Sequence, residues 1–271
     1  MTQVEAVEKF ARSLAQNTVE NLELRTNDFR LGDGFETSTN SVLSALLARQ
    51  SALAVGLIES PPSWNGHIAP LILRSMIELL ISVRWILIDP EQRSKEYISY
   101  GLGQEKLLTA NYQKELEEGN ADKRVELIVE RNLDWIESQM FQMFVEVNLG
   151  SWTGMSVRKM CDEIGDPSLY KFSFAPFSAC THNSWNHVGK WNARLCENPM
   201  HKQHMVGFVA DIWPIVDFVA NACKYLELVI DAFDSHYGFN SELKKPRALF
   251  EEAVELFAEE WNSAASADEE E

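Results

Sequence analysis

Apolar residues recur at every third or fourth position along most of the chain, with polar and charged residues between them. This spacing is typical of helices that turn one face toward a core. It predicts long helices over residues 2–22, 41–59, 67–88, 90–118, 121–148, 206–233 and 247–262. Residues 151–174 are more broken, Pro176 is expected to open a short helix, and Pro214 is expected to kink the helix over 206–233.

Prolines separate several of the predicted helices: Pro61-Pro62 ends the second, and Pro90 begins the fourth. No alternating pattern indicates paired strands. The stretches 41–59, 67–88 and 206–233 are too apolar to stand alone, so we expect them to share one core. The pattern therefore predicts one all-α domain over residues 1–262, a single multi-helix bundle with long antiparallel helices. A disordered acidic C-terminal tail is expected over residues 263–271.

Acidic residues outnumber basic ones, with 41 Asp and Glu against 24 Lys and Arg and a net charge of −17. Nine of the acidic residues lie within 251–271, where there is no basic residue, so the first 250 residues carry a net charge of −8. This balance excludes a generally basic nucleic-acid-binding surface, although it leaves open a local basic cleft. The acidic C-terminal segment is expected to keep the protein soluble, and the alternative is that it binds a basic partner.

The sequence indicates neither a membrane protein nor a secreted one. No stretch reaches the roughly 18 uninterrupted apolar residues of a membrane span. The N-terminal residues lack the basic and then apolar layout of a secretory signal. The four cysteines, at 161, 180, 196 and 223, form no C-x-x-C pair of the kind that binds zinc. We therefore expect a cytoplasmic protein with free thiols and no membrane partner.

Arg74 and Glu78 lie four residues apart in the apolar segment 71–81. On a helix they share a face that otherwise carries apolar side chains. Two charges on such a face are costly unless they pair with each other or with polar groups opposite. One interpretation is a buried ion pair that fixes how two helices meet. The functional alternative is that Arg74 holds an anion or orients a catalytic group.

Ser178 and His182 are also four residues apart, and they share a face if Pro176 begins a helix. A hydroxyl beside an imidazole is typical of a nucleophile and its base. His182 is the best general-base candidate in the chain, because histidine titrates near neutral pH. The alternatives are a serine that only orients the histidine and a histidine with a structural role in the core. No G-x-S-x-G elbow supports a hydrolase of the α/β type.

His201 and His204 would share a face of a helix, but no carboxylate or cysteine lies at a supporting spacing. The H-E-x-x-H and paired Glu-x-x-His motifs of metal-binding helices are absent. We therefore expect no metal and no cofactor. Arg194 and His201 match the loose R-x(4–6)-H spacing of HEPN-type ribonucleases, which cut RNA without a metal. Asn198-Pro199 would break the helix on which that motif usually lies.

Several short motifs follow one another along the chain. They are Arg-x-x-x-Glu at 74–78, Asp-Pro-Glu at 89–91, tyrosines at 97 and 100, Trp-Thr-Gly-Met-Ser at 152–156, and Tyr-x(7)-Ser-x(3)-His at 170–182. In this order they resemble the bacterial domain-of-unknown-function family 5677, whose members are all-helical and often encoded near mobile elements or defence genes. The resemblance spans roughly residues 45–235. Small residues usually follow the family's histidine, whereas Asn183-Ser184-Trp185-Asn186 follow it here.

The resemblance implies a single polar site inside the bundle, formed by Arg74, Glu78, Tyr170, Ser178 and His182. Four of these are the candidate catalytic residues: Arg74, Glu78, Ser178 and His182. The candidate binding residues are Tyr97, Trp152, Tyr170 and His187. The resemblance implies no particular activity, because the family has none that is settled.

Two functions fit these observations. The first is a module of a bacterial defence or mobile-element system that binds an unknown protein partner or a small ligand. The alternative is a metal-independent HEPN-like ribonuclease or phosphodiesterase effector that acts on RNA, with His182 as general acid/base and Arg74 as phosphate clamp. The geometry discriminates between them, because an enzyme needs Arg74 and His182 in an open cleft, whereas a binding module would seal them from solvent. Trp152, Trp185 and Trp191 are a hypothetical partner surface, and a homo-oligomer is a further hypothesis.

Overall fold

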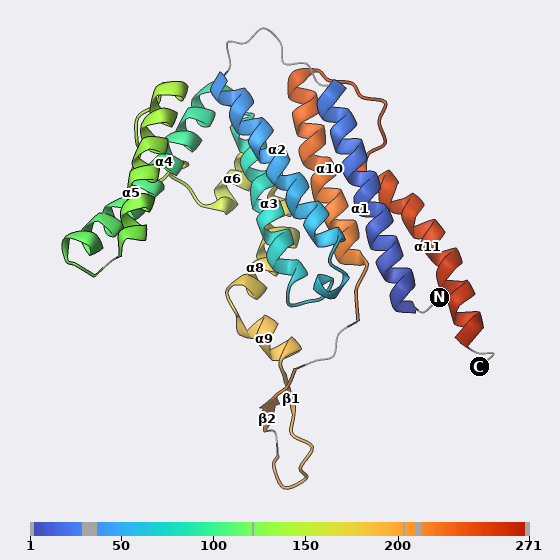
Figure 1. Cartoon of the computed structure of the whole chain (residues 1–271). Helices are drawn as coiled ribbons and strands as arrows, with labels where there is room; N and C mark the ends of the chain where they lie inside the picture. The colour runs from blue at the N-terminus through green and yellow to red at the C-terminus, as the bar shows by residue number, and fades with distance from the viewer. Residues whose placement is uncertain (1–2, 29–36, 121, 203, 210–212, 269–271) are drawn as a thin grey trace.

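The computed structural model describes residues 3–28, 37–120, 122–202, 204–209 and 213–268. Five long helices pack side by side in the main body (Figure 1). They are α1 (Gln3–Asp28), α2 (Thr37–Ile58), α3 (Ala69–Ile86), α10 (Asp217–Tyr237) and α11 (Pro246–Asp268). The prediction of an all-α bundle is confirmed. The last helix continues to Asp268, into the segment expected to be a disordered tail, and residues 269–271 lie outside the described part.

Two further long helices, α4 (Pro90–Glu117) and α5 (Lys123–Met143), form an antiparallel arm that projects from the body (Figure 1). The arm has a small core of its own, formed by Leu102, Ile136 and Val145. Short elements connect the arm to α10. They are α6 (Val157–Glu163), α7 (Pro167–Leu169), the π-helical turn η2 (Tyr170–Phe174), α8 (Ala175–Thr181), α9 (Trp185–Trp191), β1 (Ala193–Leu195) and β2 (Met205–Gly207).

The central helix of the body is α3, which contacts α2, α10, α6 and α8. Because neighbours surround it, most of its side chains are buried, which explains the nearly continuous apolar run in its sequence. The turn before it is fixed by Trp64, which follows the 3-10 turn η1 (Pro61–Ser63) and is fully buried. The predicted break at Pro61-Pro62 is thus confirmed.

One helical segment in the described part of the chain, Ser38–Ile58 in α2, is long and apolar enough to cross a membrane by length and composition alone. In the structure 39% of this apolar window is buried. Its buried residues belong to the core cluster that α2 shares with α3 and α10. A core helix of a soluble protein has the same composition, and the expectation of no membrane partner stays a prediction.

The prediction of a helix over residues 206–233 was wrong at 206–209 and 213–216, and residues 210–212 lie outside the described part. Helix α10 begins only at Asp217, and Pro214 precedes it rather than kinking it. Residues 205–207 instead form β2, which pairs antiparallel with β1, so that Leu195 lies opposite Met205. The expectation that no strands pair was therefore wrong as well. A short apolar run fits a strand as well as a buried helix, and proline is disfavoured inside a helix.

The arm depends on a close backbone contact at Gly103 in α4. A methyl group at this position would lie 1.8 Å from the backbone oxygen of Asn148. The segment after α5 is held there by the Asn148 N–H, which donates to the Ser99 carbonyl at 3.0 Å. We expect Gly103→Ala to lower the free energy of unfolding by about 2 kcal/mol, because the segment must move away from α4.

Gly101, two residues earlier in α4, is the matched control. A methyl group there would meet no atom within 4 Å. Gly101→Ala should raise the free energy of unfolding by about 0.5–1 kcal/mol, because alanine loses less backbone entropy in a helix. Urea unfolding of both variants measures the difference. Equal effects of the two substitutions would contradict the close contact.

Candidate functional site

Arg74 in α3 is the centre of the polar site that the sequence predicted. Its Nε donates a hydrogen bond to Ser178 Oγ at 2.8 Å, and its Nη1 forms an ion pair with Glu78 Oε2 at 2.7 Å. Its guanidinium also lies 3.3 Å from the centre of the Phe174 ring. The structure thus brings together Arg74, Glu78 and Ser178. Their catalytic role stays a prediction.

Phe174 and Ser178, the partners of Arg74 outside α3, come from a helical run that packs against α3 through η2 and α8. Within this run the Ala175 N–H donates to the carbonyl of Tyr170, which is five residues back. The next residue, Pro176, has no N–H to donate, so a normal α-helical bond is impossible there. The resulting π turn stacks the rings of Tyr170 and Phe174 at 5.4 Å. Tyr170 thus supports the ring on which Arg74 lies. Turns of this π type are frequent at functional sites.

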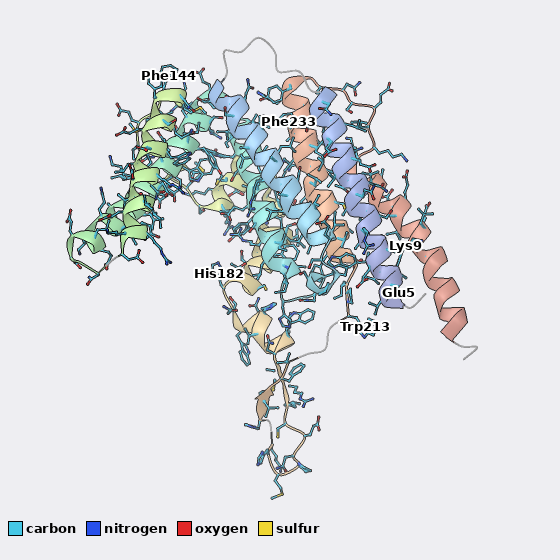
Figure 2. All side chains as sticks on the ribbon, viewed as in Figure 1. Glu5, Lys9, Phe144, His182, Trp213 and Phe233 are labelled. Atoms are coloured by element: carbon cyan, nitrogen blue, oxygen red, sulfur yellow. The ribbon has the colours of Figure 1, made fainter. Side chains whose placement is uncertain are left out.

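His182 does not join this site. Helix α8 ends at Thr181, and the His182 N–H donates to the Ser178 carbonyl at 3.0 Å as the helix cap. Its imidazole is exposed on the outside of the molecule (Figure 2). Asn183 follows in the left-handed region, with φ of 50°, and turns the chain toward α9. The Ser178 hydroxyl instead accepts from Arg74, and no hydrogen bond joins it to the imidazole among the residues that the structure describes.

The expectation of a buried Arg/Glu/Ser/His site is thus only partly correct. The Arg74 side chain is 13% exposed, but the Glu78 side chain is 53% exposed and His182 is exposed as well. Glu78, one turn further along α3, thus pairs with Arg74 from the exposed surface. Arg74 is mostly buried and His182 is exposed, so the two side chains do not share one environment.

Tyr97 and Trp152 form a packed aromatic cluster with Trp85. The centre of the Trp152 ring lies 5.1 Å from that of Tyr97 and 5.2 Å from that of Trp85, both in edge-on contact. Trp85 Nε1 donates to Glu163 at 2.7 Å. Burial raises the pKa of the Tyr97 hydroxyl. This cluster joins α3, α4 and α6, so these two candidate binding residues have a structural role.

His187 in α9 lies in a second aromatic cluster, at the other end of α3. Its ring centre is 5.9 Å from that of His67, which is in turn 5.8 Å from that of Trp191. Partial burial, and next the charge of His67, lower the pKa of His187. Since Trp152 contacts Trp85 near the last turn of α3, the tryptophans at 152, 185 and 191 do not form one surface.

A groove that the sequence analysis missed lies between α2 and the arm. Its volume is about 380 Å³. Its apolar lining comes from three helices and includes Val42, Ala45, Leu46, Ile98, Leu102, Trp135 and Met143. Tyr97, a candidate binding residue, lines it as well, and Arg49 is its one cation. The only sequence signal for this groove is Trp135, a large aromatic residue within a mostly polar stretch of α5.

A further correction concerns the histidines that were considered as metal ligands. The structure brings together Cys196, His201 and His204, whose possible ligand atoms all lie within 4.8 Å of one another. His201 and His204 were expected on one face of a helix, with no cysteine at a supporting spacing. They lie instead in the connection between β1 and β2, where hairpin pairing returns the chain to Cys196.

Comparison with known proteins concerns mainly the middle of the chain. No curated protein and no solved structure matches the chain. A family model described as a family of unknown function (DUF5677) matches residues 40–197. This range includes Arg74, Glu78, Tyr170, Ser178 and His182, and it ends before α10. More than half of the sequence is covered, and the chain therefore belongs to the family of unknown function DUF5677.

Proposed function

We propose that the protein is a non-catalytic binding module that holds an amphipathic helix of a protein partner in the groove between α2 and the arm. The observation that carries this proposal is the groove itself. It is a hollow between helices with an almost wholly apolar lining and one cation. Such grooves bind the apolar face of a helix through side chains spaced three, four and seven residues apart.

The α5 side of the groove supports a helical occupant. Ile128, Trp135 and Gln139 fall on one flank of α5, and the Trp135 side chain remains half exposed although it lines the groove. An exposed tryptophan at the edge of an apolar hollow is typical of an anchor residue in a protein interface. The expected partner helix therefore buries Trp135.

The α2 side determines the charge of the occupant. Arg49 is exposed at the groove and forms no ion pair with any residue that the structure describes. The rest of the protein is strongly acidic. A partner helix with an acidic residue beside its apolar face would pair with Arg49.

The geometry around Arg74 supports a binding module over the nuclease. Two of the five guanidinium donors of Arg74, at Nε and Nη1, are already bound by Ser178 and Glu78, and Glu78 neutralises the charge that a phosphate clamp would offer. Glu78 would also repel a phosphate. His182 is exposed beyond the end of α8, away from these contacts. We regard Arg74 as the residue that fixes α8 on α3.

The cellular setting is also a proposal. The four cysteines are free, which supports a reducing cytoplasm. The resemblance to proteins encoded near mobile elements and defence genes supports a role in a bacterial system of that kind. The partner would then be another protein of the same system.

Site-specific photo-cross-linking in the host tests the proposal. Benzoylphenylalanine in place of Trp135 should cross-link to a protein partner, whereas the same residue in place of Phe141, which is exposed elsewhere on α5, should not. Mass spectrometry should locate the cross-link in an amphipathic helix with an acidic residue. The corresponding synthetic peptide should bind the purified protein, and Arg49→Glu should weaken its affinity at least about 10-fold.

Three results would contradict the proposal. The first is equal cross-linking from positions 135 and 141, and the second is a peptide affinity that Arg49→Glu leaves unchanged. The third is a small-molecule adduct in native mass spectrometry without a protein cross-link, which would make the groove a ligand site.

A further inference from the structure

We propose that Cys196, His201 and His204, in the connection between β1 and β2, bind one zinc ion. The Sγ atom of Cys196 lies 3.7 Å from Nδ1 of His201, and the ring centres of His201 and His204 are 5.6 Å apart. In a tetrahedral zinc site, ligand atoms about 2.0–2.3 Å from the metal are roughly 3.3–3.6 Å from one another. Small side-chain rotations therefore bring all three ligands to one ion.

The backbone fixes two of the ligands before any metal binds. The strand register pairs Ala193 with Gly207 and Leu195 with Met205. The next pair in the same register is Cys196 and His204, and the Cys196 N–H donates to the His204 carbonyl at 2.8 Å. Directly opposite residues in an antiparallel pair have neighbouring side chains. The thiol and this imidazole are therefore adjacent because of strand pairing.

A tight turn brings in the third ligand. The His201 N–H donates to the Asn198 carbonyl at 2.9 Å, and the Met200 N–H donates to Asn198 Oδ1 at 3.0 Å. Asparagine in the first position and proline in the second are the residues preferred in such a turn. The turn directs the chain back, so that His201 meets Cys196. The Asn-Pro pair that excluded a helix here is the one that builds this cluster.

The hairpin has little else to hold its tip together. Leu195, Met200 and Met205 are exposed, so they form no core under the loop. The hairpin also projects from the body beyond α9 (Figure 1). A metal bound by three side chains would supply the missing stabilisation, as in small zinc-binding loops.

The donor set favours zinc. One thiolate and two imidazoles suit a borderline metal ion, whereas calcium and magnesium prefer oxygen ligands. Cysteine binds as the thiolate, so binding releases one proton for each ion. Three protein ligands leave the fourth tetrahedral position for water or for a group from another molecule.

Metal titration of the whole chain tests the inference. After treatment with a chelator, the protein should bind one zinc per chain in calorimetry, and cobalt should give the thiolate charge-transfer and tetrahedral d–d bands in its absorption spectrum. Cys196→Ser should abolish the charge-transfer band and weaken zinc binding at least about 100-fold. His201→Ala should also weaken zinc binding at least about 100-fold. His182→Ala, which removes an exposed imidazole outside the hairpin, should leave both readouts unchanged.

Circular dichroism should show that these variants keep the helical fold, because the hairpin lies outside the core. The inference fails if zinc does not bind stoichiometrically at micromolar concentration, or if Cys196→Ser keeps wild-type affinity. It also fails if cobalt gives an octahedral spectrum, or if the chain takes up copper but not zinc.

Discussion

Replacing Trp64 with alanine is expected to lower the free energy of unfolding by about 4 kcal/mol, as for other large aromatic residues removed from a core. The Trp64 side chain is 0% exposed, and its ring lies edge-on to Phe10 of α1 at 5.9 Å. Its Nε1 donates to the Leu57 carbonyl at the end of α2, at 2.7 Å. The substitution thus leaves a cavity where α1 and α2 meet, and the Leu57 carbonyl keeps only its hydrogen bond from the Ser60 N–H, at 3.1 Å.

The backbone of Trp64 makes the site more sensitive than an ordinary core position. Its carbonyl accepts a hydrogen bond from the Ile215 N–H at 2.7 Å, which positions the segment that leads into α10. Collapse around the cavity would therefore disturb three long helices, and little relaxation can offset the loss.

Trp64→Phe is the matched control, since it keeps an aromatic ring but loses the indole N–H. Its expected cost is about 1–2 kcal/mol, from the smaller ring and from the lost hydrogen bond between the indole and the Leu57 carbonyl. Urea unfolding followed by far-ultraviolet circular dichroism measures both variants. If alanine costs no more than phenylalanine, the ring does not fill the core at this point.

The long helices could be predicted because their signal is local. Helical spacing of apolar residues, interrupted by Pro61-Pro62 and Asp89-Pro90, placed α2, α3 and α4 within a few residues of their observed bounds. The same reasoning put Arg74 beside Glu78, since four residues along a helix make one turn. It failed at 206–209 and 213–216, where an apolar run carries no information on whether it pairs as a strand.

Contacts between distant segments could not be predicted in this way. The hydrogen bond from Arg74 to Ser178 joins residues 104 positions apart, and the cost of a buried cation called for a partner without naming it; only the resemblance to the family pointed to Ser178. His182 was expected to work with Ser178, but the Ser178 hydroxyl is bound by Arg74 and the imidazole is exposed to solvent. The groove needs three helices at once, and no periodicity in one helix reports on it.

The hairpin cluster was missed for a different reason. Spacing rules for metal ligands assume a local structure, and a helix was assumed for His201 and His204. A turn at Asn198-Pro199 would have predicted that His201 returns toward Cys196. The sequence thus contained the signal, but as turn chemistry and not as a metal motif.

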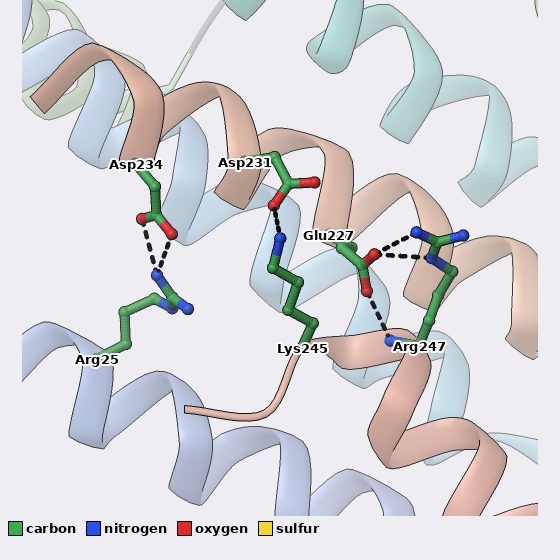
Figure 3. A network of polar contacts seen from close by, with 6 residues as sticks. All are labelled: Arg25, Glu227, Asp231, Asp234, Lys245 and Arg247. Atoms are coloured by element: carbon green, nitrogen blue, oxygen red, sulfur yellow. Dashed lines mark hydrogen bonds and ion pairs between the residues drawn. The ribbon is translucent and has the colours of Figure 1, made fainter. Parts of the chain in front are cut away.

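Helix α10 presents three acidic residues along one face, at 227, 231 and 234, toward α1 and the start of α11 (Figure 3). They pair with Arg247, Lys245 and Arg25, respectively. The pair most enclosed on both sides is Arg25 with Asp234, at 2.6 Å, with side chains 5% and 16% exposed. Here the loss of one partner leaves a charge that solvent reaches poorly.

Arg25→Leu is therefore expected to lower the free energy of unfolding by about 3 kcal/mol at pH 7, and this deficit should shrink as the pH falls. Burial raises the pKa of Asp234 even in the wild type, where Arg25 lowers it. Without Arg25 the pKa of Asp234 rises further above its value in the unfolded chain. A group whose pKa is raised on folding stabilises the protein below its unfolded pKa, and this contribution is lost as the pH rises through the folded pKa. Urea unfolding between pH 7 and pH 4 measures the recovery.

The double variant Arg25→Leu/Asp234→Asn separates charge from packing. Asparagine at position 234 carries no charge, so no uncompensated anion is buried when Arg25 is removed. The double variant should therefore be more stable than Arg25→Leu at pH 7, and its deficit relative to the wild type should no longer shrink as the pH falls. A deficit of Arg25→Leu that stays constant from pH 7 to pH 4 would show that the lost packing of the arginine stem, and not the stranded carboxylate, destabilises the protein. In that case the polar face of α10 would not depend on charge pairing at this position.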